Sequence, residues 1–162
     1  MMKVASILVF LVVATSIEGY GDPVLLRVRS VNTVYTSTYL IKKTPLNMHA
    51  AKEACAKCGG FLATIDDLPE HHFLVNELQK LHIKSAWVGL NDKAYEKVFR
   101  WDGSNLPGFK KWCPHEPNNF GNAEDCVELI ADKKCLNDLG CAHVRPYICE
   151  INQSKVTSDV TV

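Results

Sequence analysis

Three short runs decide how this sequence is interpreted: Glu116-Pro117-Asn118, Glu124-Asp125-Cys126 and Leu136-Asn137-Asp138. The first two lie in or just after a stretch from Asn91 to Glu124 in which Gly, Pro, Asn and Asp are frequent. That composition predicts a long loop. A loop of this length is uncommon in a compact domain unless it is functional, and something then has to hold its shape. We therefore expect a bound metal ion to organise it.

Five oxygen-bearing side chains in these runs have the chemistry of a calcium site. Calcium takes roughly six to eight oxygen ligands, including carboxylates and carboxamides. A carboxylate accepts hydrogen bonds and an amide nitrogen donates them, so a calcium ringed by both suits two neighbouring sugar hydroxyls. The candidate ligands are Glu116, Asn118, Glu124, Asn137 and Asp138. Composition alone leaves open that they are ordinary turn residues, because Asn and Asp are common in turns.

Outward from these runs, the whole chain has the size and composition of one folded domain. It has 162 residues, of which 47% are hydrophobic. This is enough for a packed core and too many for a disordered chain. The 18 Lys and Arg residues balance the 18 Asp and Glu residues. There is therefore no basic surface that would favour nucleic acid.

The N-terminal residues 1–19 resemble a secretory signal peptide. A short basic start is followed by an apolar run from Val4 to Thr15, and then by small residues. The run is shorter than the roughly 20 residues that a membrane-spanning helix needs. We expect a secreted, extracellular protein without membrane insertion. The expected organisation is a signal peptide at 1–19, a domain at 20–152 and a polar, disordered tail at 153–162.

The pattern predicts two helices. Thr44 and Pro45 fit the N-cap and first position of a helix that runs to about Lys57 and stops at Gly59-Gly60. A second helix is expected from Asp66-Asp67 to about Leu81, with His71 and His72 on its surface. Strands are expected at 20–34, 35–41, 61–65, 86–90, 99–101, 126–130 and 147–151, and around 137–138. Early helices and late short strands indicate an α+β fold.

The motifs, taken in order, resemble those of the C-type lectin family across essentially the whole chain after the signal peptide. Trp87-Val88-Gly89-Leu90 is similar to the family's Trp-Ile-Gly-Leu core strand. Glu116-Pro117-Asn118 matches its sugar-selecting triplet, and Glu124 to Val127 matches the block that follows. Leu136-Asn137-Asp138 is similar to its Trp-Asn-Asp block, with Leu136 in place of Trp. The resemblance implies a short-form domain with two helices, short antiparallel sheets and a long calcium-binding loop.

The resemblance also implies the roles of the candidate ligands. The five residues named above would hold one principal calcium ion, and Pro117 would be in the cis form. The Glu-Pro-Asn order implies sugars of the mannose, N-acetylglucosamine and fucose type. The sugar would contact Glu116, Asn118, Glu124 and Asn137. Phe120 is either an apolar wall beside the sugar or an ordinary packing residue, and the sequence favours neither.

A second, auxiliary calcium ion is a further expectation from the family pattern. Asp92 and Glu96 stand at the spacing of the family's second site, and Asp125 matches its third carboxylate. Asn119 stands where some members carry Asp, and this lost charge should weaken the site. The alternative is that Asp92 and Glu96 are simply solvated.

Seven cysteines follow the expected signal peptide, and in an oxidising compartment most should pair. A zinc site is the alternative, but Cys55-x-x-Cys58 has no second such pair. The resemblance implies the bonds Cys55–Cys149 and Cys126–Cys141. A bond between Cys113 and Cys135, which flank the candidate ligands, would hold the two ligand segments together. Cys58 is then left either buried and free or exposed and able to link two chains as a disulfide-bonded homodimer.

Catalysis is not expected. The sequence has no Gly-x-Ser-x-Gly elbow and no Gly-rich phosphate loop. Paired carboxylates occur in glycosidases, but calcium ligation opposes the raised pKa that the catalytic acid needs. The rival to a glycan-binding lectin is a calcium-independent domain of the same family that binds protein or a mineral surface, as in a matrix protein.

Overall fold

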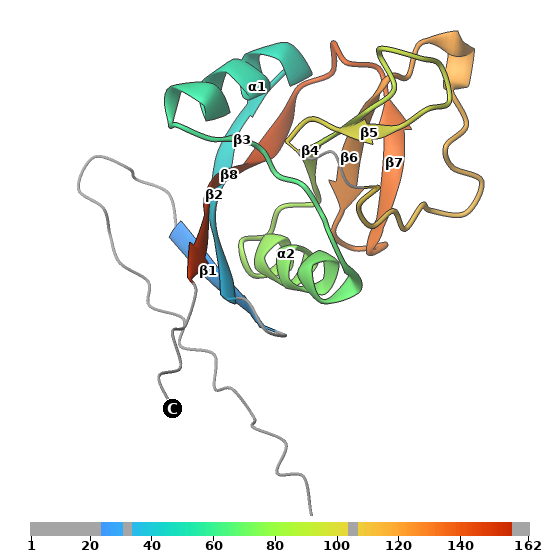
Figure 1. Cartoon of the computed structure of the whole chain (residues 1–162). Helices are drawn as coiled ribbons and strands as arrows, with labels where there is room; N and C mark the ends of the chain where they lie inside the picture. The colour runs from blue at the N-terminus through green and yellow to red at the C-terminus, as the bar shows by residue number, and fades with distance from the viewer. Residues whose placement is uncertain (1–23, 31–33, 104–106, 157–162) are drawn as a thin grey trace, which may run out of the picture.

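The computed structural model describes residues 24–30, 34–103 and 107–156 (Figure 1). The expected signal peptide at 1–19 lies outside them. The helices are α1 (Met48–Lys57) and α2 (Leu68–Lys80), with one 3-10 turn, η1 (Phe120–Asn122). The strands are β1 (Val24–Ser30), β2 (Val34–Leu46), β3 (Phe61–Leu62), β4 (Ser85–Asn91), β5 (Arg100–Trp101), β6 (Cys126–Ile130), β7 (Cys135–Leu139) and β8 (Arg145–Val156). In this part of the chain no helix is long and apolar enough to cross a membrane.

The strands form one twisted mixed sheet in the order β1-β2-β8-β4-β6-β7, with β3 added to β8 and β5 to β4. All pairs are antiparallel except β4 with β8, which meet in parallel at Trp87 and Tyr147. This contact joins the short antiparallel sheets that we expected into one. The α+β fold with two helices is confirmed.

The start of α1 differs from the expectation. Asn47, not Thr44, is the N-cap, and its side-chain oxygen accepts from the Ala50 amide at 2.9 Å. Thr44 and Pro45 belong to the end of β2, where the register against β8 shifts between Lys42 and Leu46. A proline has no N–H to donate to a ladder, and an irregular strand end accommodates it. β2 therefore continues past both residues to a last pair at Leu46, and the helix begins later.

α2 begins as expected, but one of its histidines is buried. Asp67 caps the helix by accepting from the Glu70 amide at 2.8 Å. His72 is exposed, whereas His71 is 0% exposed and stacks edge-on against Phe109 of the long loop, with 5.6 Å between ring centroids. The surface position predicted for His71 is therefore wrong, because the loop covers that face of the helix. Burial lowers the pKa of His71 to about 4, helped by the charge of Lys111 and by His72.

Several strands differ in length from the pattern, β3 and β8 among them. β3 is confined to Phe61 and Leu62, although residues 63–65 are buried as well. At the other end of the domain, β8 continues to Val156, which pairs with Val34 of β2. The first residues of the expected tail, 153–156, are therefore strand, and 157–162 lie outside the described residues.

The core fills the space between the sheet and the helices. Leu136, which replaces the family's Trp, is 0% exposed within the larger of two clusters and so contributes to the core. Trp87 anchors the smaller cluster under α1 and donates its indole N–H to the Leu46 carbonyl at 2.9 Å.

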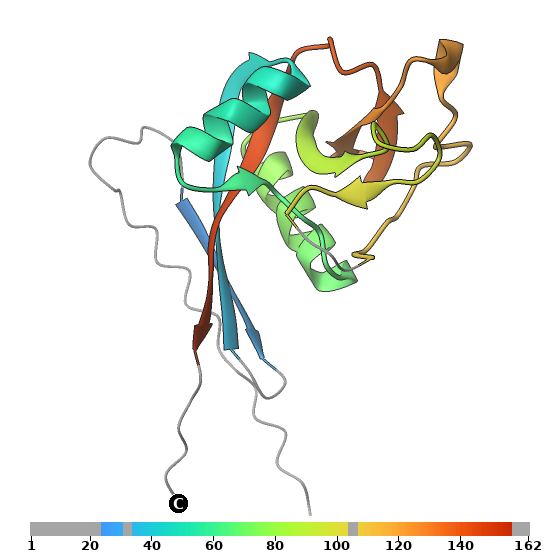
Figure 2. The ribbon, with the colours of Figure 1, turned by 45° about the horizontal axis from the view of Figure 1, so that its top comes forward.

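The molecule has two poles (Figure 2). The long loop, coloured yellow to orange, surrounds the β5 and β7 end of the sheet. β1 and the outer halves of β2 and β8 form a ribbon that projects away from that end.

Candidate functional site

The long loop is fastened to β7 by one disulfide and a short backbone ladder. Cys113 is bonded to Cys135, as we expected. Beside that bond, the Cys113 amide donates to the Leu136 carbonyl at 2.9 Å, and the Leu136 amide donates to the Lys111 carbonyl at 2.7 Å. The segment that enters the Glu-Pro-Asn triplet therefore lies against the strand that carries Asn137 and Asp138.

The remaining cysteines also follow the predicted map. Cys55 is bonded to Cys149 and Cys126 to Cys141. Among the described residues Cys58 is the one cysteine without a disulfide. It is half-buried at the end of α1, where it packs against the smaller core cluster, so it matches neither the fully buried nor the exposed alternative.

Asp138, on β7, binds the backbone of the long loop. Its side chain is 1% exposed on β7. Its two carboxylate oxygens accept the backbone amides of Asn118 at 3.0 Å and Asn119 at 2.8 Å. Two amides on one carboxylate fix the backbone directly after the Glu-Pro-Asn triplet.

Glu116 and Glu124 extend this acidic group. The Glu116–Pro117 peptide is cis, as the family resemblance implied. Burial raises the pKa of Glu116, with Asp138 and Glu124 adding to the rise and Asn118 opposing it. Glu124 accepts the Phe120 amide at 2.7 Å through one oxygen. Four of the predicted ligands are thus gathered: Glu116, Asn118, Glu124 and Asp138.

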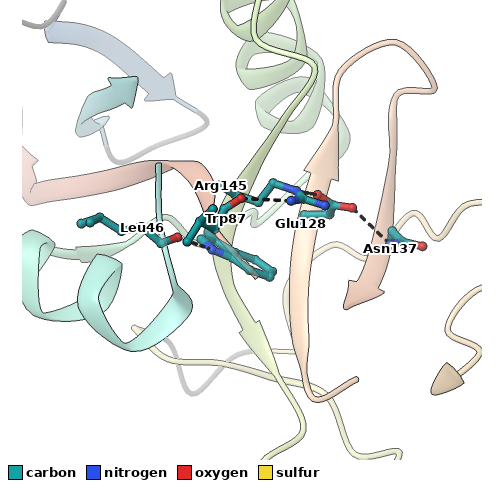
Figure 3. Close-up of polar contacts among 6 residues, drawn as sticks. Leu46, Trp87, Glu128, Asn137 and Arg145 are labelled. Carbon is teal, nitrogen blue, oxygen red and sulfur yellow. Dashed lines mark hydrogen bonds and ion pairs between the residues drawn. The ribbon is translucent and has the colours of Figure 1, made fainter. Parts of the chain in front are cut away.

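The fifth candidate ligand, Asn137, is held from another side. It precedes Asp138 on β7, and its amide nitrogen donates to Glu128 of β6 at 3.2 Å (Figure 3). Glu128 in turn accepts from the Arg145 guanidinium at 2.6 Å. Sequence reasoning missed both residues. The available signal was a charged residue inside Cys126–Ile130, a run that otherwise consists of buried-strand residues.

The four auxiliary residues fall into two contacts. Asp92 is 4% exposed, so it is not simply solvated. Its backbone amide donates to the Asp125 carbonyl at 3.2 Å, and one oxygen of its carboxylate accepts the Lys97 backbone amide at 2.8 Å. The other oxygen is buried without a hydrogen-bond partner among the described residues. Asn119 donates to the exposed Glu96 at 2.6 Å.

The donor set suits a calcium ion. Glu116 has one buried oxygen with no hydrogen-bond partner among the described residues, beside two further carboxylates. Repelling carboxylates with an unsatisfied oxygen are what a divalent cation would neutralise. In the same part of the chain, acidic, histidine and cysteine side chains alone form no group of three able to hold a metal. A site here therefore needs carboxamide or carbonyl oxygens as well, and Asn118 and Asn137 carry them.

Phe120 projects from the loop rather than into the core. Its side chain is 79% exposed at the start of η1. Plain packing, one of the two interpretations of this residue, is therefore wrong.

The fold and this loop define a lectin-type binding domain. The Lectin C-type domain model matches residues 44–151, and the chain belongs to that family. The human protein "C-type mannose receptor 2" is 33% identical over 113 residues, which is 69% of this chain and 8% of the receptor. The chain thus spans less than a tenth of that relative.

Solved structures agree on the fold. The cow C-type carbohydrate-recognition domain of CD23, determined in the presence of a GlcNAc2Man3 oligosaccharide, superposes with a TM-score of 0.66 and 25% identity. That match covers 74% of this chain and 90% of the CD23 chain. Herring type II antifreeze protein gives a TM-score of 0.65 and 27% identity, covering 76% and 94%. The same fold therefore occurs in a carbohydrate-recognition domain and in an antifreeze protein.

Proposed function

We propose that this chain is a secreted, calcium-dependent lectin for sugars of the mannose, N-acetylglucosamine and fucose type. The carrying observation is the group of Glu116, Glu124 and Asp138, which places an unpartnered buried carboxylate oxygen beside two more carboxylates. The mannose-type triplet and the presence of a Man-containing oligosaccharide in the CD23 structure support the sugar class.

When bound, calcium would neutralise the carboxylates and coordinate two vicinal sugar hydroxyls. Glu116, Asn118, Glu124, Asn137 and Asp138 would hold it. The carboxylates would accept hydrogen bonds from the sugar hydroxyls, while the amides of Asn118 and Asn137 would donate to them. Phe120, exposed beside these residues, would cover one face of the sugar ring. These roles are binding roles, and the proposal includes no catalytic step.

Isothermal titration with methyl mannoside tests the proposal. Binding should occur with calcium, disappear in excess chelator, and fail on acidification because the ligand carboxylates must be ionised. Full-strength binding in chelator would refute calcium dependence.

The sugar class has its own test. Glu116→Gln together with Asn118→Asp exchanges donor and acceptor across the site, so mannose binding should weaken and galactose binding should improve. Lys43→Gln, an exposed position in β2 on a different part of the sheet, serves as a surface control. Unchanged preference for mannose would show that the triplet does not select the sugar.

An auxiliary calcium ion at Asp92, Glu96, Asn119 and Asp125 is part of the proposal. The buried, unpartnered oxygen of Asp92 supports it. Calcium titration should show a second, weaker event that Asp92→Asn removes. One event, unchanged by the substitution, would contradict it.

A covalent dimer through Cys58 would raise avidity for clustered glycans. Its partly accessible side chain supports the idea. Non-reducing electrophoresis should then show a dimer that Cys58→Ser abolishes, whereas a monomer with one titratable thiol would refute it.

Binding to protein or mineral is the second candidate function. The similarity to an antifreeze protein and the exposed Tyr95, Phe120 and Val144 favour it. A glycan array read with and without chelator distinguishes the two functions, because this candidate predicts no calcium-dependent glycan signal.

A further inference from the structure

Glu128 is a buried carboxylate outside the proposed ligand set. It is 5% exposed in the middle of β6. A buried carboxylate is costly unless it is paired and hydrogen-bonded. One oxygen accepts from the Arg145 Nε at 2.6 Å, and the other accepts from the Asn137 Nδ2 at 3.2 Å (Figure 3). Both oxygens therefore have a specific partner.

The three side chains cross several strands of the sheet. Arg145 begins β8, where its backbone pairs with Leu46 of β2. Its guanidinium also donates to the Val144 carbonyl at 3.0 Å. β4 lies between β8 and β6 in the sheet, so the Arg145 side chain reaches over it to Glu128. Glu128 then faces Asn137 across the β6–β7 pair.

The chemistry of Glu128 decides which way the Asn137 amide faces. An ionised carboxylate can only accept hydrogen bonds. The Asn137 side chain must therefore present its nitrogen to Glu128, and Figure 3 shows its oxygen on the side away from Glu128. Rotating the amide by half a turn would set two acceptors against each other.

We propose that Glu128 and Arg145 are positioning residues that fix the Asn137 amide with its oxygen available to calcium. Arg145 holds the Glu128 carboxylate in place through the 2.6 Å hydrogen bond, and Glu128 sets the amide. The second hydrogen on the Asn137 nitrogen remains available to a sugar hydroxyl. This inference rests on the proposed function to the extent that Asn137 is taken as a calcium ligand.

Glu128→Gln is the informative variant because it has nearly the same shape. Arg145 offers only donors, so the new amide must turn its oxygen toward Arg145. Its nitrogen then faces Asn137, which has to rotate and present its own oxygen to that nitrogen. The Asn137 nitrogen would then occupy the place that calcium requires for an oxygen.

The first measurement needs no calcium. In the ¹⁵N-labelled protein, the Asn137 side-chain amide is assigned by its loss in Asn137→Asp. One of its protons should be shifted downfield and slow to exchange in the unsubstituted protein. Both properties should be lost in Glu128→Gln and retained in the matched control Glu77→Gln, whose carboxylate pairs with the exposed Lys80.

The second measurement is calcium affinity. Changes in the partners that orient a metal ligand typically cost 10–100-fold in affinity. We expect a rise of that size in the calcium Kd for Glu128→Gln and less than a two-fold change for Glu77→Gln. Thermal unfolding in chelator verifies that both variants fold.

A double variant separates positioning from general damage. Glu128→Gln combined with Asn137→Asp restores the hydrogen bond with donor and acceptor exchanged, and it keeps an oxygen ligand at position 137. The calcium Kd should return to within about ten-fold of the original value. The remaining loss of binding free energy would then be under the 1.4 kcal/mol that a tenfold change represents. Mannose binding should stay weak, since the aspartate cannot donate to a hydroxyl.

The outcomes are distinguishable. Unchanged Asn137 amide signals in Glu128→Gln, a calcium Kd within two-fold of the original, or failure of the double variant to recover calcium would each overturn the inference. If the unsubstituted protein binds no calcium, the proposed function fails, and the amide signals still decide whether Glu128 orients Asn137.

Discussion

Replacing Cys113 and Cys135 together by serine removes the covalent link between the long loop and β7. The disulfide closes a loop between two cysteines that are 22 residues apart in the sequence. Loop-closure entropy for that length gives a loss of about 3.4 kcal/mol in unfolding free energy. The proposed calcium ligands should nevertheless stay close, because the hydrogen bonds between Cys113 and Leu136 and between Leu136 and Lys111 lie in the backbone and survive the change.

Urea unfolding in excess chelator, followed by tryptophan fluorescence, measures the stability effect. With a slope of roughly 1–3 kcal/mol per molar urea, the midpoint should fall by about 1–3 M. Cys58→Ser is the control for a cysteine that closes no loop, and because Cys58 is only half-buried its midpoint should fall far less than that of the double variant. A stability loss under about 1 kcal/mol would refute the entropy argument. A rise of more than a hundred-fold in the calcium Kd would refute the claim that the backbone ladder suffices.

Three further substitutions test the core of the domain. His71 has a pKa of about 4 in the folded protein, below its value in the unfolded chain, so stability should fall by about 1–3 kcal/mol as pH drops from about 6.5 toward 4. His71→Leu should remove this pH dependence of stability, measured by urea unfolding at both pH values. The same fall in stability with pH in the variant would contradict the assignment. Tyr39→Phe deletes the hydroxyl that donates to the buried Glu70 and should cost about 1.5–3 kcal/mol in the unfolding free energy at pH 7; a neutral effect would contradict the pairing. Gly89→Ala would place a Cβ 2.6 Å from a β3 carbonyl and should destabilise by about 1–3 kcal/mol in calorimetry, unless β3 can shift.

Local signals were enough for the parts of the fold that local chemistry decides. Asp67 and Pro69 mark the start of α2, and the structure keeps that cap. β6 spans Cys126–Ile130, the bounds that the sequence predicted. The three disulfides followed from family positions and from the places of Cys113 and Cys135 beside the candidate ligands.

Competing local signals explain the error at α1. Thr44 and Asn47 can both cap a helix, and they stand three residues apart. The choice between them depends on how far β2 pairs with β8, and that partner lies about a hundred residues away in the sequence. Propensity cannot resolve a choice made by a distant strand.

His71 and Glu128 were misjudged or missed for the same kind of reason. The helical period of α2 marks its apolar face, but the loop around Phe109 covers an adjoining face as well. Glu128 is buried because Arg145 reaches it from a strand that is not its neighbour. Burial of a polar side chain depends on its partners in the tertiary structure, and a single sequence does not show which distant residues those partners are.

The two-pole shape has a practical consequence for how the domain is displayed. Val156, where the chain leaves the described domain, pairs with Val34 at the tip of the β1–β2–β8 ribbon, and the loop lies at the opposite pole (Figures 1 and 2). A biotin or a lipid linker attached beyond Val156 would orient every molecule on a sensor chip or bead with its loop toward the solution. Attachment through surface lysines would orient the molecules at random and cover a fraction of the loops. With the proposed glycan binding, uniform orientation would let closely spaced copies engage neighbouring branches of one glycan, and the density of the coating would then set the observed avidity.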